Sequence, residues 1–130
     1  MGSSILIGAD IVPTESNYSL FINGDVDKLV GDSLLKVLND ADYIIMNLET
    51  PLSDCGNPIE KAGPCLCAPR ATIAGLKRIN PYFFTLANNH IMDYGPEGLF
   101  STIELLESNG IAYAGVGRNV EEAQIYSCFT

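Results

Sequence analysis

The run YIIMNLE at residues 43–49 decides the fold, because four apolar residues lead directly into a segment that contains Asn47 and Glu49. A short unbroken apolar run is typical of a strand covered on both faces of a parallel sheet, whereas a strand with one wet face alternates polar and apolar residues. Three more runs of this kind follow the same rule. They lie at residues 5–7, 82–86 and 111–114, and they lead into GAD (8–10), ANNH (87–90) and Gly115. Together the four runs predict a mainly parallel sheet.

Each gap between these runs contains apolar residues at steps of three or four, the spacing that gives a helix one apolar face. Cap and stop residues mark the ends of the helical segments. The helices are predicted after Asp32, between Pro69 and Asn80, and between Gly95 and Gly110. The sequence therefore predicts an α/β fold of order β-α-β-α-β-α-β, with helices on both faces of the sheet.

Length and composition predict one domain and exclude two classes of partner. The chain has 130 residues, of which 47% are hydrophobic, enough for one core. We assign residues 5–130 to this domain and treat residues 1–4, which are mostly small and polar, as a tag remnant or a flexible start. A net charge of -9 repels nucleic acid, and no apolar stretch is long enough for a membrane span.

The four cysteines predict neither a structural zinc site nor a disulfide-stapled mini-domain. Cys55, Cys65, Cys67 and Cys128 lack the paired C-x-x-C spacing of zinc sites. Cys65 and Cys67 share a face if their segment is extended, but one pair cannot close a tetrahedral site. We interpret all four as free thiols that behave as small buried hydrophobes.

Three oxygen-bearing residues follow successive apolar runs, one strand-helix unit apart. Asp10, Glu49 and Asn89 are expected to meet at the carboxyl edge of the sheet, where open α/β sheets bind their ligands. Two carboxylates and an amide suit magnesium or manganese, or zinc if imidazoles join. The irregular segment at residues 52–68 follows the second strand at this edge, and we interpret it as a substrate-facing loop.

The same residues also have a structural interpretation. Asn88, Asn89 and Asp93 can build a turn, since short polar side chains satisfy backbone groups in turns and caps. A lone histidine such as His90 is more often a hydrogen-bonded structural residue than a catalyst. The glycine-rich segment at residues 115–120 half resembles a dinucleotide-binding loop, and we interpret it as a turn and helix cap.

Three blocks of the sequence resemble the signature blocks of the CapA family of capsule and poly-gamma-glutamate biosynthesis. The blocks are N-L-E-x-P at 47–51, A-N-N-H-x-x-D-x-G at 87–95, and GVGRN at 115–119 followed by Glu122 and Ala123. The resemblance extends from about Ile5 to Ala123. It implies the N-terminal half of a metallophosphoesterase-like (calcineurin-like) sandwich, truncated at its C-terminal end.

The resemblance also implies roles for the candidate site residues. Asp10, Glu49 and Asn89 become metal ligands, His90 a general acid or a stabiliser of negative charge, and Asp93 the residue that holds the imidazole or caps the next helix. Two departures leave the implied site incomplete: phosphoesterases have a histidine two residues after the first Asp, where this chain has Val12, and His90 is its one histidine. We therefore expect weak or absent metal binding and no catalysis by this chain alone.

Two functional hypotheses follow from the resemblance. In the first, the full-length protein is a metal-dependent hydrolase or transferase of capsule or poly-gamma-glutamate biosynthesis, located in the cell envelope; a chain complete as printed would stay in the cytoplasm. In the second, the chain is a non-catalytic module that binds an anionic polymer or a partner chain, with Lys61 and Arg70 attracting poly-gamma-glutamate or a small anionic substrate. We expect a homo-oligomer, because half of such a sandwich exposes an apolar face. A nucleotide-binding domain ranks third.

Overall fold

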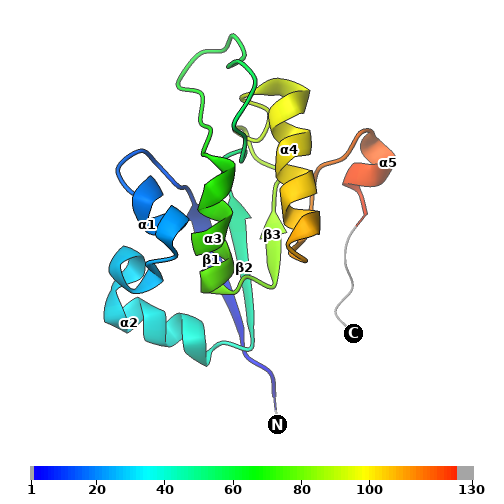
Figure 1. The fold of residues 1–130 in the computed structure, drawn as a ribbon. Helices are drawn as coiled ribbons and strands as arrows, with labels where there is room; N and C mark the ends of the chain where they lie inside the picture. Colours follow the sequence, from blue (N-terminus) through cyan, green and yellow to red (C-terminus); the bar gives the residue numbers. More distant parts are fainter. Residues whose placement is uncertain (1, 126–130) are drawn as a thin grey trace.

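The computed structural model describes residues 2–125, and its strands form one parallel sheet in the order β1-β2-β3-β4 (Figure 1). This confirms the predicted α/β fold class. All four strands lie where the apolar runs predicted them. They are β1 (Ile5–Ile11), β2 (Tyr43–Leu48), β3 (Phe83–Thr85) and β4 (Ala112–Ala114).

Helices connect the strands at the predicted places. Gly31, with non-helical backbone angles, kinks α2 one residue before the predicted cap Asp32. Asn80 ends α3 in the left-handed conformation, and Gly110 follows α4 with a positive φ. The helices are α1 (Tyr18–Asn23), α2 (Val26–Asp40), η1 (Arg70–Thr72), α3 (Ile73–Ile79), α4 (Gly95–Ser108) and α5 (Val120–Ala123). The short α1 before α2 was not predicted.

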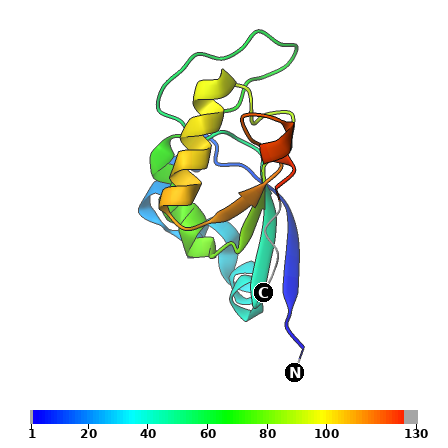
Figure 2. The same cartoon turned by 90° about the vertical axis from the view of Figure 1, so that its right-hand side faces the viewer.

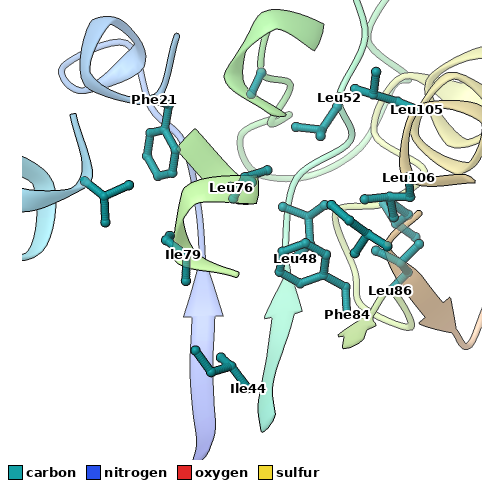
Figure 3. Close-up of a cluster of buried hydrophobic side chains, with 14 of the residues drawn as sticks. Phe21, Ile44, Leu48, Leu52, Leu76, Ile79, Phe84, Leu86, Leu105 and Leu106 are labelled. Carbon is teal, nitrogen blue, oxygen red and sulfur yellow. The ribbon is translucent and has the colours of Figure 1, made fainter. Parts of the chain in front are cut away.

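The core lies between one face of the sheet and α1 to α4, as Figure 3 shows for its largest side chains. Leu48 and Phe84 extend from the central strands and are fully buried together with Leu76 of α3 and Leu106 of α4. Burial of each such side chain contributes about 1.5–3 kcal/mol. Gly75 permits a close approach of α3 to α1, because a Cβ there would lie 2.6 Å from the Cα of Phe21.

The helices cover the two faces of the sheet unevenly. In the edge-on view of Figure 2, α1 to α4 lie on one side of the sheet and only the short α5 lies toward the other. On the side opposite α1 to α4, hereafter the open face, Ile5 and Ile7 are 55% and 77% exposed. The register places Ile45 beside Ile7, and Phe83 beside Ile45, on this face. The sequence predicted helices on both faces of the sheet, whereas α1 to α4 all cover the same face. An apolar run indicates that a strand can be buried, but it does not indicate what buries it.

The assigned domain extends beyond the residues that the structure describes. Its residues 126–130, which include Cys128, lie outside the described part of the chain. Ser4, which was set apart from the domain, pairs with Asp42 through its backbone N–H (2.7 Å) and its hydroxyl (2.8 Å). Across residues 2–125, no helix has both the length and the apolar character needed to span a bilayer.

Candidate functional site

A polar row crosses the open face at the carboxyl ends of three strands. Asp10 pairs in register with Asn47, and Asn47 pairs with Thr85. The Asn47 amide donates to Asp10 Oδ1 at 2.7 Å, and the Thr85 hydroxyl donates to Asn47 Oδ1 at 3.1 Å. Asn47 therefore orients the Asp10 carboxylate and leaves its second oxygen without a partner among the described residues.

Asn88 fixes the turn that follows β3. Its amide donates to the carbonyl of Leu48 at 2.9 Å and to Asn47 Oδ1 at 3.2 Å. Its own Oδ1 accepts the backbone N–H groups of His90 and Ile91 at 3.0 and 2.9 Å. With every polar atom of its side chain engaged, Asn88 has the predicted turn-building role, and it ties the ANNH segment to the end of β2.

Glu49 and Asn89 lie at the same carboxyl edge as Asp10, as the spacing predicted. The Glu49 N–H donates to the carbonyl of Ile11 at 3.3 Å, which places Glu49 beside the end of β1. Asn89 directly follows the anchored Asn88 and is exposed. Among residues 2–125, the side chains of Glu49 and Asn89 make no hydrogen bond, so their oxygens are available to a ligand.

A hollow of about 590 Å³ adjoins Asn88 and Asn89 at this edge. Its opposite wall is the turn after β4, which includes Gly115 and Gly117. Gly115 has a φ of 93°, and a Cβ there would lie 2.7 Å from the Cβ of Ala87. This glycine therefore lets the turn after β4 pack directly against the ANNH segment and shape the hollow.

A second polar cluster joins the loop after β2 to the turn after β3. The carboxylate of Asp93 is fully buried. It accepts hydrogen bonds from the Lys61 ammonium, from His90 Nδ1 at 2.7 Å and from the backbone N–H of Leu66 at 2.6 Å. The Ile59 N–H also donates to the Asp93 carbonyl at 2.8 Å. Asp93 thus anchors the middle of the loop at residues 52–68.

The three donors decide the ionisation of Asp93. Burial on its own would raise the pKa of this carboxyl, but hydrogen bonds from Lys61, His90 and the Leu66 N–H outweigh it and hold the pKa below its usual value. Asp93 is therefore ionised at neutral pH and can only accept hydrogen bonds.

An ionised Asp93 also fixes the tautomer of His90. Because the carboxylate only accepts, His90 Nδ1 must carry a proton in the 2.7 Å contact. The Lys61 ammonium, 3.3 Å from the same nitrogen, cannot also donate to it, and directs its protons to Asp93 and the Asn89 carbonyl. In neutral His90 the lone pair is therefore on Nε2, which can accept a proton or a hydrogen bond.

Acid should remove the stabilisation that Asp93 provides. Since folding lowers the pKa of this carboxyl, its contribution is fully present above the unfolded-state pKa of about 3.9 and is lost as pH falls through the lowered folded-state value. We expect the difference in free energy of unfolding between the wild type and Asp93→Asn to shrink below about pH 4. Urea titrations of both proteins from neutral to acid pH measure it, and a difference that stays constant would contradict the assignment.

The described residues do not form a complete metal site. No three His, Cys, Asp or Glu side chains within residues 2–125 gather closely enough to hold a metal ion. The oxygens at hand are those of Asp10, Glu49 and Asn89, two carboxylates and one amide. Hard oxygen donors fit magnesium or manganese, and the set is short of the four to six ligands that these metals or zinc take. Their role as metal ligands stays a prediction, as do the catalytic roles of His90 and Asp93.

The two cations considered for polyanion binding are already paired within the protein. Lys61 binds the buried Asp93, and only 20% of its side chain is exposed. Arg70 donates to the Ser101 hydroxyl at 2.7 Å and pairs with Glu104 at 3.3 Å. Attraction of an anionic polymer would therefore have to compete with these contacts.

Sequence reasoning missed Asn47 and Thr85 as members of the site. The sequence identifies Asn47 only as the first residue of the N-L-E-x-P block. A signal was present, because residues two apart in a strand face the same side of the sheet. Asn47 is therefore expected on the same face as Glu49. Thr85 gave no comparable signal, since threonine is common in strands.

Comparisons with known proteins place these residues in context. The family model described as bacterial capsule synthesis protein PGA_cap matches residues 4–130. A probable polyglutamine synthesis accessory protein of Mycobacterium tuberculosis is 32% identical over 95 residues, which are 72% of this chain and 25% of that protein. The capsule biosynthesis protein CapA of Bacillus anthracis is 33% identical over 91 residues, 67% of this chain and 22% of that protein. The chain thus spans about a quarter of the length of these relatives.

Proposed function

Because the chain belongs to the bacterial capsule synthesis protein family PGA_cap, we propose that it supplies part of a divalent-metal site used in capsule or poly-gamma-glutamate synthesis. The whole protein would be a metal-dependent hydrolase or transferase that acts on an amide or phosphoester bond. The names of the relatives, a polyglutamine synthesis accessory protein and a capsule biosynthesis protein, support a role in this synthesis. The hydrogen bond from Asn47 to Asp10 is the observation that supports the metal site.

That hydrogen bond prepares Asp10 as a ligand. The Asn47 amide holds one oxygen of this carboxylate, so the second oxygen is presented in a fixed direction. Glu49 and Asn89 would add a carboxylate and an amide oxygen at the same edge. When bound, a divalent cation supplies Lewis acidity toward a carbonyl or phosphoryl oxygen. Further ligands would have to come from outside residues 2–125.

His90 would exchange protons at this edge. Asp93 holds the imidazole through Nδ1 and leaves Nε2 for the reacting group. In its neutral form this nitrogen accepts a proton, and in its protonated form it donates one to a leaving group or stabilises negative charge. Lys61 and Leu66 keep Asp93 in place, so the loop supports the imidazole indirectly.

Metal binding tests the proposal. We expect Mn²⁺ or Zn²⁺ to bind weakly to this chain and the double variant Asp10→Asn with Glu49→Gln to abolish the binding, because both anionic ligands are lost. Isothermal titration calorimetry of both proteins measures it.

The matched control is Asp27→Asn with Asp40→Asn, which removes the same charge from α2 at exposed positions. Unchanged metal binding in the Asp10 and Glu49 double variant would overturn the proposed site. Equal loss in the control variant would show that only net charge matters.

The open face favours a second candidate, a non-catalytic module that assembles with a partner chain. Ile5 and Ile7 are exposed beside Ile45 and Phe83, and such an apolar face on a sheet is typical of an interaction surface. The description of one relative as an accessory protein agrees with a partner role. In isolation, this face would be covered by a second copy of the chain.

Sedimentation distinguishes a self-associating chain from a monomer. We expect a homodimer or larger species whose association is weakened by Ile7→Lys, since a lysine on the open face resists burial. Ile22→Lys, at an exposed position on α1, is the matched control and should leave association unchanged. A well-behaved monomer at micromolar concentration would contradict self-association.

A further inference from the structure

The thiols of Cys55 and Cys67 contact the same residue of the loop after β2. Cys67 Sγ donates to the backbone carbonyl of Ser53 at 3.4 Å, and Cys55 Sγ lies 3.6 Å from the Ser53 hydroxyl. Both cysteines line one small hollow, together with Tyr18 and Tyr94. Both thiols are free, and Cys55 is exposed rather than buried as the sequence suggested.

Backbone hydrogen bonds hold the two cysteines on adjacent arms of the loop. The Ser53 N–H donates to the carbonyl of Ala68 and the Ala68 N–H to the carbonyl of Pro51, both at 2.9 Å. Cys67 directly precedes Ala68. On the other arm, the Cys55 N–H donates to the Ser53 hydroxyl at 3.3 Å, and this hydroxyl donates to the Cys55 carbonyl at 2.9 Å, so the chain folds back beside Ser53. Side-chain rotation can therefore direct both sulfurs into the shared hollow.

Cys65 is a poorer partner for either thiol. Its sulfur donates to the carbonyl of Ile59 at 3.4 Å, away from Ser53. Residues two apart in an extended segment have Cα atoms about 6.6 Å apart, close to the upper limit for a disulfide. Cys65 and Cys67 are thus not expected to join.

We propose that Cys55 and Cys67 are a redox-active pair that forms a reversible disulfide across the base of this loop. The exposed Cys55 thiolate attacks a small-molecule disulfide such as oxidised glutathione, forming a mixed disulfide and releasing one glutathione thiolate. The Cys67 thiolate then attacks the Cys55 sulfur, forms the internal disulfide and releases the second glutathione. The two cysteines lose two electrons and two protons, and the glutathione disulfide is reduced to two thiols.

The second step should be slow at neutral pH. Burial raises the pKa of the Cys67 thiol, and the nearby Asp54 and Cys55 raise it further. The thiolate fraction of Cys67 therefore increases with pH, and so should the rate of ring closure. The mixed disulfide at Cys55 is expected to accumulate first.

A disulfide here would close a ring that contains Lys61 and Leu66. Both residues donate to the buried Asp93, which holds the imidazole of His90. Oxidation would keep these donors close to Asp93 even when the ion pair opens, because a closed ring has fewer open conformations. The redox state of the loop is thereby coupled to the order of the turn after β3.

Peptide mapping tests the proposal on the whole chain. The protein, with Cys128→Ser in every sample, is incubated with oxidised glutathione, alkylated and cut with trypsin. Cleavage after Lys61 separates Cys55 from Cys65 and Cys67, so a disulfide is seen as two joined peptides. We expect joined peptides in the chain and in Cys65→Ser, and separate peptides in Cys55→Ser and Cys67→Ser. The yield should rise with pH.

Two results would contradict the proposed disulfide between Cys55 and Cys67. Joined peptides that persist in Cys67→Ser would assign the bond to Cys65, and glutathione adducts without joined peptides would show that the two sulfurs do not meet. Neither outcome depends on metal binding or on the capsule proposal. Urea unfolding of the oxidised and reduced chains adds a second readout, and the oxidised chain should unfold at the higher urea concentration.

Discussion

Replacing Asp93 with asparagine should destabilise the chain by about 3 kcal/mol and release the loop at residues 52–68. The substitution removes the negative charge and one of the two oxygens that accept from the three donors, and it leaves the Lys61 ammonium without an anionic partner. Breaking a buried ion pair from one side costs about 3–5 kcal/mol. We expect the lower end, because the Lys61 side chain is 20% exposed and can be rehydrated. Urea unfolding gives the free energy, and the rate of proteolysis at Lys61 reports loop release.

An exposed pair provides the matched control for this prediction. Asp25 pairs with Lys28 at 3.2 Å on the surface, and its side chain makes no helix-capping hydrogen bond. Asp25→Asn should cost less than about 1 kcal/mol, as is usual for exposed pairs. If the two asparagine variants lose equal stability, Asp93 is not the anchor of the loop. Retained protease resistance in Asp93→Asn would point the same way.

The element order was predictable because each element has a local signal. The unbroken run at residues 43–46 marks β2, and the proline and glycine at 95–96 mark the start of α4. Parallel strands require crossover connections, so their carboxyl ends lie at one edge of the sheet. Open α/β sheets bind ligands at this edge, which is why the candidate site was expected there. The cover of the open face was not predictable, since Ile5 and Ile7 look the same in sequence whether a helix, a second sheet or a partner chain lies over them.

The candidate site was predictable to the level of position but not of contact. Strand spacing placed Asp10, Glu49 and Asn89 at one edge, where the structure also has them. The pairing of Lys61 with Asp93 depends on how a long irregular loop folds back, and no periodicity encodes that closure. A lysine near a loop therefore suggested polyanion binding, whereas its ammonium is engaged with a buried acid.

These contacts assign the two polar clusters different tasks. The row of Asp10, Asn47 and Thr85 is open to solvent on the sheet face and leaves oxygens free, as a ligand site requires. The cluster around Asp93 is buried and leaves no polar atom of that residue free, as an anchor requires. His90 belongs to the anchor through Nδ1, and in the proposed function it would serve the ligand site through Nε2.

Phe84→Ala should cost about 3–5 kcal/mol, whereas Phe83→Ala should cost about 1 kcal/mol. The two residues are neighbours in β3 and face opposite sides. Phe84 is fully buried beneath the helices, so its removal leaves a cavity. Phe83 is half-buried on the open face, where water can fill the space that the ring leaves. Urea unfolding of the two variants at low protein concentration measures the difference.

This comparison also tests what covers the open face. If a second copy packs on it, the cost of Phe83→Ala should rise with protein concentration, because association stabilises only the folded state. The cost of Phe84→Ala should not change with concentration, since its cavity lies within one chain. Equal and large costs at every concentration would show that the open face is already covered within a single chain. That outcome would contradict both the one-sided core and the self-association that follows from it.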